Sequence, residues 1–150
     1  YMENLYQKQT YDSVIDRLNK LTPSSQRLWG KMEVAQMLAH CKEAFKVPLS
    51  KKSMKRSPMF YLFGWMVKSK LYNDEQWKQG LPTAPNFIIK DQCNFEEENA
   101  GLQKMIIEFY TLGPQGSGLY PHPFFGKFSS GQWGKAMYKH LDHHLRQFGV

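Results

Sequence analysis

Four segments with apolar residues at intervals of three and four constrain the fold of this 150-residue chain more than any other feature. They cover residues 11–21, 33–47, 95–110 and 129–148, and stretches rich in proline or glycine separate them. This spacing places apolar side chains on one face of a helix, which must be buried against another element. The chain is therefore predicted to be all-α, an antiparallel four-helix bundle within a single domain, residues 1–150.

Helix boundaries are marked by residues that cap or break helices. Glu96, Glu97 and Glu98 favour a helix start at about Phe95, and Ser129 with Gln132 forms a capping-box pattern. Residues 113–126 contain four glycines and three prolines, so no regular helix is expected between the third and fourth segments. Only residues 86–90 resemble a short strand.

Residues 59–67 are apolar on almost every side and are flanked by basic residues. The segment is far shorter than the roughly 20 residues of a membrane-spanning helix. A short buried helix is the favoured interpretation. The alternative is a patch that contacts a membrane or a partner, and some of its aromatic residues could also line a ligand pocket.

The formal net charge is +7, and a basic protein of this kind is a candidate to bind nucleic acid or an anionic membrane. No nucleic-acid-binding motif accompanies the charges, and a solvated loop and helix rim is the favoured interpretation. We therefore expect neither nucleic acid nor membrane as a partner. The basic residues concerned are Lys46, Lys51, Lys52, Lys55, Arg56, Lys68 and Lys70.

The two cysteines, Cys41 and Cys93, are far apart and neither belongs to a CxxC pair. Neither a disulfide framework nor a cysteine-based zinc finger is expected, and a reducing cytoplasm is the predicted location. The N-terminal residues lack the apolar core of a signal peptide. We expect a soluble cytoplasmic protein.

The last helical segment places two histidines, His140 and His144, within its apolar face. His143 falls outside this face and is predicted to lie at its rim or in solvent. The apolar face is defined by Trp133, Met137, Leu141 and Phe148, and the predicted solvent side by Lys135, Lys139, Asp142 and Arg146.

Burying an imidazole without a partner costs about 1–3 kcal/mol for each unsatisfied group. Because His140 and His144 are four residues apart, their rings point side by side and one metal ion could accept a lone pair from each. Hydrogen bonds to neighbouring helices or waters are the alternative. His40 lies at the rim of its helix, roughly 110° from the apolar centre, where it could reach a shared site or solvent. Cys41 is expected to be a buried apolar residue.

Three stretches carry a resemblance to a known superfamily: LTPSSQRLWGKMEVAQMLAHC, GLPTAPNF and HPFFGKFSSGQWGKAMYKHLDHHLRQFGV. Through them the chain resembles the DinB/YfiT-like superfamily of four-helix bundles, in particular a family of uncharacterised bacterial proteins within it. The resemblance implies that His40, His140 and His144 bind a divalent metal ion. It also implies an up-down-down-up helix order with a long crossover between helices two and three, and a homodimer.

Three imidazoles leave a divalent ion at least one open position, as in catalytic zinc sites. Zinc is favoured, and nickel and iron also suit these ligands. Resemblance to DinB-like relatives suggests an enzyme that transfers a low-molecular-weight thiol, such as bacillithiol or mycothiol, to a small-molecule electrophile, or a hydrolase. A non-catalytic metal or small-ligand binding module is the alternative. No catalytic residue is assigned, and His122, between two prolines, is interpreted as a turn residue.

Overall fold

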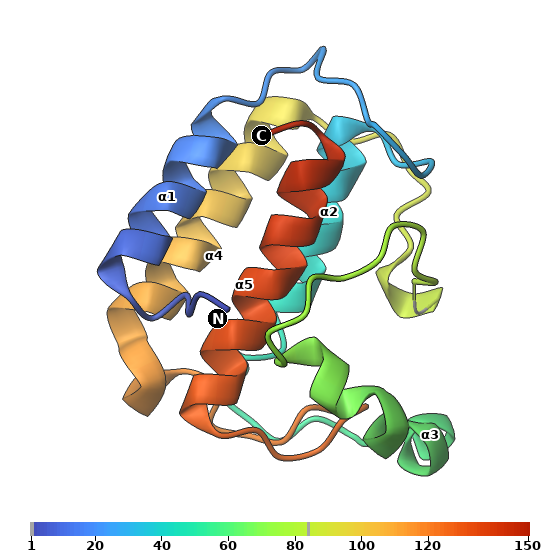
Figure 1. The fold of residues 1–150 in the computed structure, drawn as a ribbon, viewed down its shortest axis with the longest axis vertical. Coiled ribbons are helices and arrows are strands. Elements are labelled where there is room, and N and C mark those ends of the chain that lie inside the picture. The colour runs from blue at the N-terminus through green and yellow to red at the C-terminus, as the bar shows by residue number, and fades with distance from the viewer. Residues whose placement is uncertain (1, 84) are drawn as a thin grey trace.

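The four predicted helical segments form the four longer helices of the structure (Figure 1). This computed structural model describes residues 2–83 and 85–150, apart from the side chains of residues 59–63 and 86. Every regular element in the described part is a helix, which confirms the all-α class. The elements are α1 (Lys8–Asn19), α2 (Val34–Phe45), α3 (Pro58–Lys68), the 3-10 turns η1 (Ser69–Leu71) and η2 (Pro85–Phe87), α4 (Phe95–Gly116) and α5 (Ser130–Gln147).

The apolar faces of α1, α2, α4 and α5 share one core. Leu18, Leu38 and Phe109 are fully buried there, and Leu141 of α5 is nearly so. Each such side chain contributes about 1.5–3 kcal/mol by leaving water. In Figure 1, α1 and α5 run toward one end of the molecule, whereas α2 and α4 run toward the other. The most extensive helix–helix contact is between α2 and α4.

Two helices are longer than their apolar periodicity predicts. Helix α1 begins at Lys8. The predicted start is three residues later because Lys8, Gln9 and Thr10 are polar and add nothing to the apolar pattern. Helix α4 continues past residue 110 to a kink at Gly113, which has φ 65° and ψ −172°. Glycine tolerates this positive φ, and the single turn that follows ends at Gly116.

The predicted helix starts are confirmed at α4 and α5. The Asn94 side chain accepts a hydrogen bond from the Glu97 backbone N–H, and Ser129 and Gln132 form the complete capping box of α5. Residues 86–90 contain no strand; the described backbone there includes η2 instead. Pro85, which lacks a backbone donor, is compatible with this short turn and not with a central strand.

The long connection between α2 and α4 covers one side of α5. Its first part rests on the loop after α4, where the Ser57 backbone N–H donates to the Pro123 carbonyl at 3.1 Å. After α3 the chain returns along α5, and Lys139 Nζ donates to the Lys70 carbonyl at 2.7 Å and to Asn73 Oδ1 at 2.6 Å. The prediction that Lys139 and Asp142 face solvent is therefore wrong: both are buried.

Residues 59–67 are helical, as predicted, but the end of α3 is not buried. Trp65 is 73% exposed, and Met66 and Val67 are exposed as well. The predicted burial is wrong for these three residues because the described contacts of the helix with the α4–α5 loop come from Gly64, where a Cβ would collide with the Phe124 carbonyl oxygen, and from Lys68. The prediction for the side chains of residues 59–63 lies outside the described residues. None of the described helices is long and apolar enough to cross a membrane.

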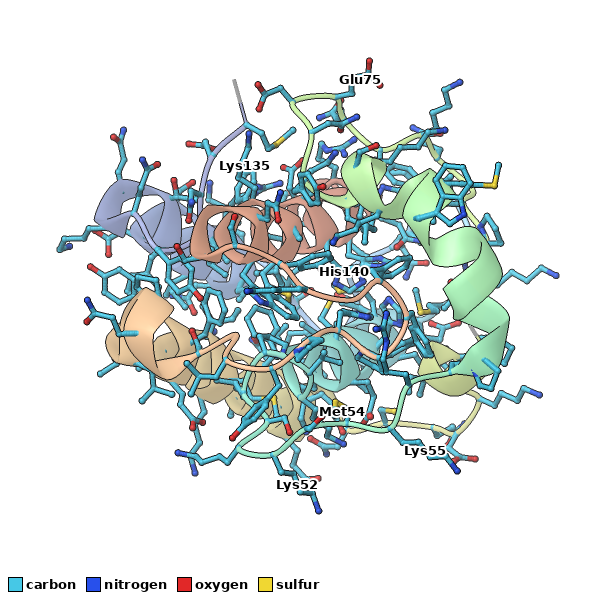
Figure 2. The ribbon with its side chains drawn as sticks, turned by 90° about the horizontal axis from the view of Figure 1, so that it is seen from below. Lys52, Met54, Lys55, Glu75, Lys135 and His140 are labelled. Carbon is cyan, nitrogen blue, oxygen red and sulfur yellow. The ribbon has the colours of Figure 1, made fainter. Side chains whose placement is uncertain are left out.

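The basic residues between α2 and η1 lie on the surface. All are exposed except Lys68, which donates to the Lys127 carbonyl at 2.5 Å. Lys52 and Lys55 lie at the periphery in Figure 2, on the side away from Glu75. Such side chains are hydrated at little cost, in accordance with the interpretation of a solvated rim.

Candidate metal centre

The structure brings together the three predicted ligands, His40 from α2 and His140 and His144 from α5. One ring nitrogen from each lies within 4.8 Å of the others, and the Nε2 atoms of His40 and His140 are 2.9 Å apart. Figure 2 shows His140 in the interior, beside α5. The i,i+4 spacing on α5 places two rings on one helix face, and the packing of α2 against α5 adds the third.

His40 is held by the backbone that follows the crossover. Its Nδ1–H donates to the Phe87 carbonyl oxygen at 2.8 Å, which leaves the Nε2 lone pair directed at His140. On the helical wheel His40 lies at the rim, yet its side chain is buried because η2 covers this side of α2. A histidine whose second nitrogen binds a carbonyl is oriented as metal ligands are.

His144 is oriented by a residue on its own helix. Its Nδ1–H donates to Gln147 Oε1 at 2.8 Å, and Gln147 Nε2 donates to the Trp29 carbonyl at 2.9 Å. The second hydrogen bond identifies which amide atom is the oxygen. Sequence reasoning missed Gln147, although its position three residues after His144 could have indicated the contact. The Phe87 and Trp29 carbonyls carry no such signal.

The three rings are in an environment that keeps them uncharged. Burial lowers the pKa of His144 to about 3 and the pKa of His140 well below its ordinary value. Burial also lowers the pKa of His40, partly opposed by the hydrogen bond to Phe87. Neutral imidazoles offer a lone pair, which is the form that binds metal ions.

His143 is buried, so its predicted place at the rim or in solvent is wrong. Its ring lies 5.6 Å from the rings of both Trp29 and Trp77, which belong to segments outside α5. Its Nδ1 is buried without a hydrogen-bond partner among the described residues. His143 does not belong to the histidine cluster, which consists of His140 and His144 on α5 and His40 on α2.

A cavity of about 220 Å³ adjoins the three histidines. It follows α5 from Trp133 to His144, and Trp77 and Phe87 form part of its wall. Its described lining contains no Asp, Glu, Lys or Arg, and most of it is aliphatic or aromatic. Such a lining suits a ligand with a substantial apolar part.

Cys41 and His122 do not join the cluster. Cys41 is fully buried, as predicted; burial raises the pKa of its thiol, and Sγ lies 3.8 Å from Met37 Sδ. His122 occupies a turn, also as predicted, in which its Nδ1 accepts from the Phe124 backbone N–H at 3.0 Å. Its backbone is paired with Gly126, and its ring lines the cavity.

The fold and the cluster define an all-α protein with three clustered histidines, two buried and one partly buried, beside an apolar cavity. The chain belongs to the family described as "protein of unknown function (DUF1569)", whose profile matches residues 3–149. Comparison with curated proteins and with solved structures gave no match.

Proposed function

We propose that His40, His140 and His144 bind one divalent metal ion. The observation that carries this proposal is the convergence of three neutral ring nitrogens within 4.8 Å. Hydrogen bonds from Nδ1 to Phe87 and Gln147 direct the lone pairs of His40 and His144 away from those partners. These are the ligand type and outer-shell support of histidine metal sites.

Hydrogen bonding alone satisfies the cluster poorly. If His140 Nε2 carries a proton, it can donate to His40, but no donor among the described residues then reaches His144 Nε2. The Nδ1 atom of His140 is also buried without a described partner. A metal ion accepts all three lone pairs, so the ligand nitrogens fit the ion, whereas His140 Nδ1 is without a described partner in either case. We propose zinc first, with nickel and iron as the alternatives.

The fold proposed is the DinB/YfiT-like four-helix bundle with up-down-down-up order. The directions of α1, α2, α4 and α5 in Figure 1 support it, as does the long crossover between α2 and α4. A cytoplasmic homodimer that binds a small molecule, and neither nucleic acid nor membrane, completes this proposal. Size-exclusion chromatography with light scattering tests the dimer.

The reaction proposed is transfer of a low-molecular-weight thiol to an electrophile. A carbon–sulfur bond forms, the carbon–leaving-group bond breaks, and the thiol proton departs with the leaving group. A divalent ion with an open position would supply Lewis-acid activation of the thiol. His40, His140 and His144 would hold the ion. Trp77 and Phe87, in the cavity wall, restrict the entry of water and bind the apolar part of the electrophile.

A non-catalytic metal or small-ligand binding module is the second candidate. It is favoured by the absence of any carboxylate or lysine from the described lining of the cavity, since no general acid or base other than histidine is present there. Metal-loaded protein that gains thermal stability with small apolar ligands and shows no turnover with several thiols and a model electrophile would support the module.

Elemental analysis of protein purified without chelator or affinity metal tests the metal site. Wild type should carry a near-stoichiometric divalent metal, and His144→Ala should lose it. His143→Ala is the matched control, because it removes a buried neighbouring histidine outside the cluster and should retain the metal. Wild type without metal, or equal retention by both variants, would contradict the proposal.

A further inference from the structure

The end of the cavity away from the metal ligands carries a polar group that the proposed metal site does not use. Trp133 and His140, seven residues apart on α5, both line the cavity, which places them about 10 Å apart along the helix. His122 stacks on Trp133 with ring centroids 6.0 Å apart. His122 therefore belongs to the Trp133 end.

The hydrogen bonds of the turn decide which nitrogen of His122 carries the proton. Nδ1 accepts from the Phe124 backbone N–H at 3.0 Å and must be unprotonated. A neutral ring then carries its proton on Nε2, which has no hydrogen-bond partner among the described residues. Burial lowers the pKa of His122 to about 4, so that the ring is neutral near pH 7. The cavity wall thus presents a fixed N–H donor.

The surroundings of this donor favour an uncharged acceptor. Aromatic rings of Phe125, Phe128 and Trp133 pack around His122 within 6.0 Å. Trp133 Nε1, on the ring that stacks on His122, is a buried N–H without a described partner. A carboxylate or phosphate would lose its hydration here without meeting a cation in the described lining.

We infer that His122 selects the ligand of the cavity: an elongated, largely apolar molecule whose neutral carbonyl oxygen accepts the Nε2–H while its other end reaches the three-histidine cluster. This inference rests on the proposed metal site and names its ligand class. His122 acts as a specificity-determining residue, because a ligand without the carbonyl leaves a desolvated donor unpaired.

Two thiols that differ only in the carbonyl test this inference by calorimetry on zinc-loaded protein. They are 4-(mercaptomethyl)acetophenone and 4-ethylbenzyl mercaptan, in which a methylene replaces the ketone. We expect wild type to bind the ketone about fivefold to tenfold more tightly, the size of one net hydrogen bond. Equal affinity for the two thiols would overturn the inference and leave the metal site standing.

Two variants separate the donor of His122 from its role in the turn. His122→Asn keeps an acceptor at the position of Nδ1 but removes the Nε2–H, and it should bind both thiols with equal affinity. His122→Gln keeps an N–H donor at the position of Nε2 and should retain the preference for the ketone. A ketone preference that survives in His122→Asn would overturn the inference. Failure of zinc-loaded wild type to bind either thiol would overturn this inference alone, whereas failure to bind zinc would overturn the proposed metal site and this inference together.

Discussion

Helices α5 and α3 have opposite relations between composition and burial. Helix α5 is rich in polar residues, yet Lys139, Asp142 and His143 are as buried as ordinary core residues. Helix α3 is the most apolar helix by sequence and exposes Trp65 and Met66. The difference arises because α5 lies between α1, α2, α4 and the returning crossover, whereas the described contacts of α3 are with the loop at residues 124–128 and with η1. Position within the fold, more than composition, decides burial.

The two buried charged side chains of α5 are compensated for the loss of water in different ways. Lys139 donates to a carbonyl and to an amide oxygen, and burial lowers the pKa of its ammonium group to about 8. Asp142 accepts from Arg17 and Arg146, each at 2.9 Å. The histidines are compensated less completely: the described protein atoms leave lone pairs of His140 and His144 unsatisfied, and His143 Nδ1 has no described partner. Because His140 and His144 also share a cluster with His40, this cluster is the place on α5 where a metal ion is expected.

The largest effect should follow from truncating the apolar side of α5. Leu141→Ala creates a cavity in the core and should lower the free energy of unfolding by about 2–5 kcal/mol, measured by urea denaturation. Leu28→Ala, at a leucine that is 70% exposed, is the control and should change it by about 0.5 kcal/mol or less. Equal losses in both variants would show that burial does not distinguish these positions.

Removing the outer-shell support of His144 should weaken metal binding while the fold persists. Gln147→Met keeps the side-chain volume but loses the hydrogen bonds to His144 and Trp29. The dissociation constant for zinc, from competition with a chromophoric chelator, should rise about 10- to 100-fold. Gln9→Met, at an exposed position on α1, should leave it unchanged. An unaltered constant in Gln147→Met would mean that Gln147 does not orient the ligand.

The ion pairs of α5 should contribute more than those on the surface. Asp142→Asn removes the charge between Arg17 and Arg146 in a mostly buried setting, and it should cost about 1–2 kcal/mol of unfolding free energy. Asp12→Asn breaks the exposed pair with Lys8 and should have no measurable effect. A double-mutant cycle with Arg17→Met measures the coupling, and a coupling near zero would contradict the prediction.

The smallest effect is expected on α3. Trp65→Ser with Met66→Ser replaces two exposed side chains and should shift the free energy of unfolding by about 0.5 kcal/mol or less per residue. Neither wild type nor this variant should sediment with anionic phospholipid vesicles. Binding by wild type that the variant loses would instead support the hypothesis of an interaction patch at residues 59–67.

Much of the local structure could be predicted because its causes are local. The capping box at Ser129 involves atoms three residues apart, and the i,i+4 spacing of His140 and His144 places both rings on one side of a helix whatever packs against it. The kink at Gly113 also follows from a glycine and the proline after it. By contrast, the strand-like pattern at residues 86–90 would need a pairing partner, and the described backbone there includes η2 instead.

The helical class, the main breaks between helices and the two candidate ligands on α5 could be predicted from the amino-acid order, because periodicity and capping act over a few residues. Folding brings His40 to those ligands and buries His143 and Lys139. It also places His122 in the wall of the same cavity. These outcomes depend on contacts between segments distant in the chain, above all the crossover that returns along α5, and such contacts leave no periodic pattern in the sequence.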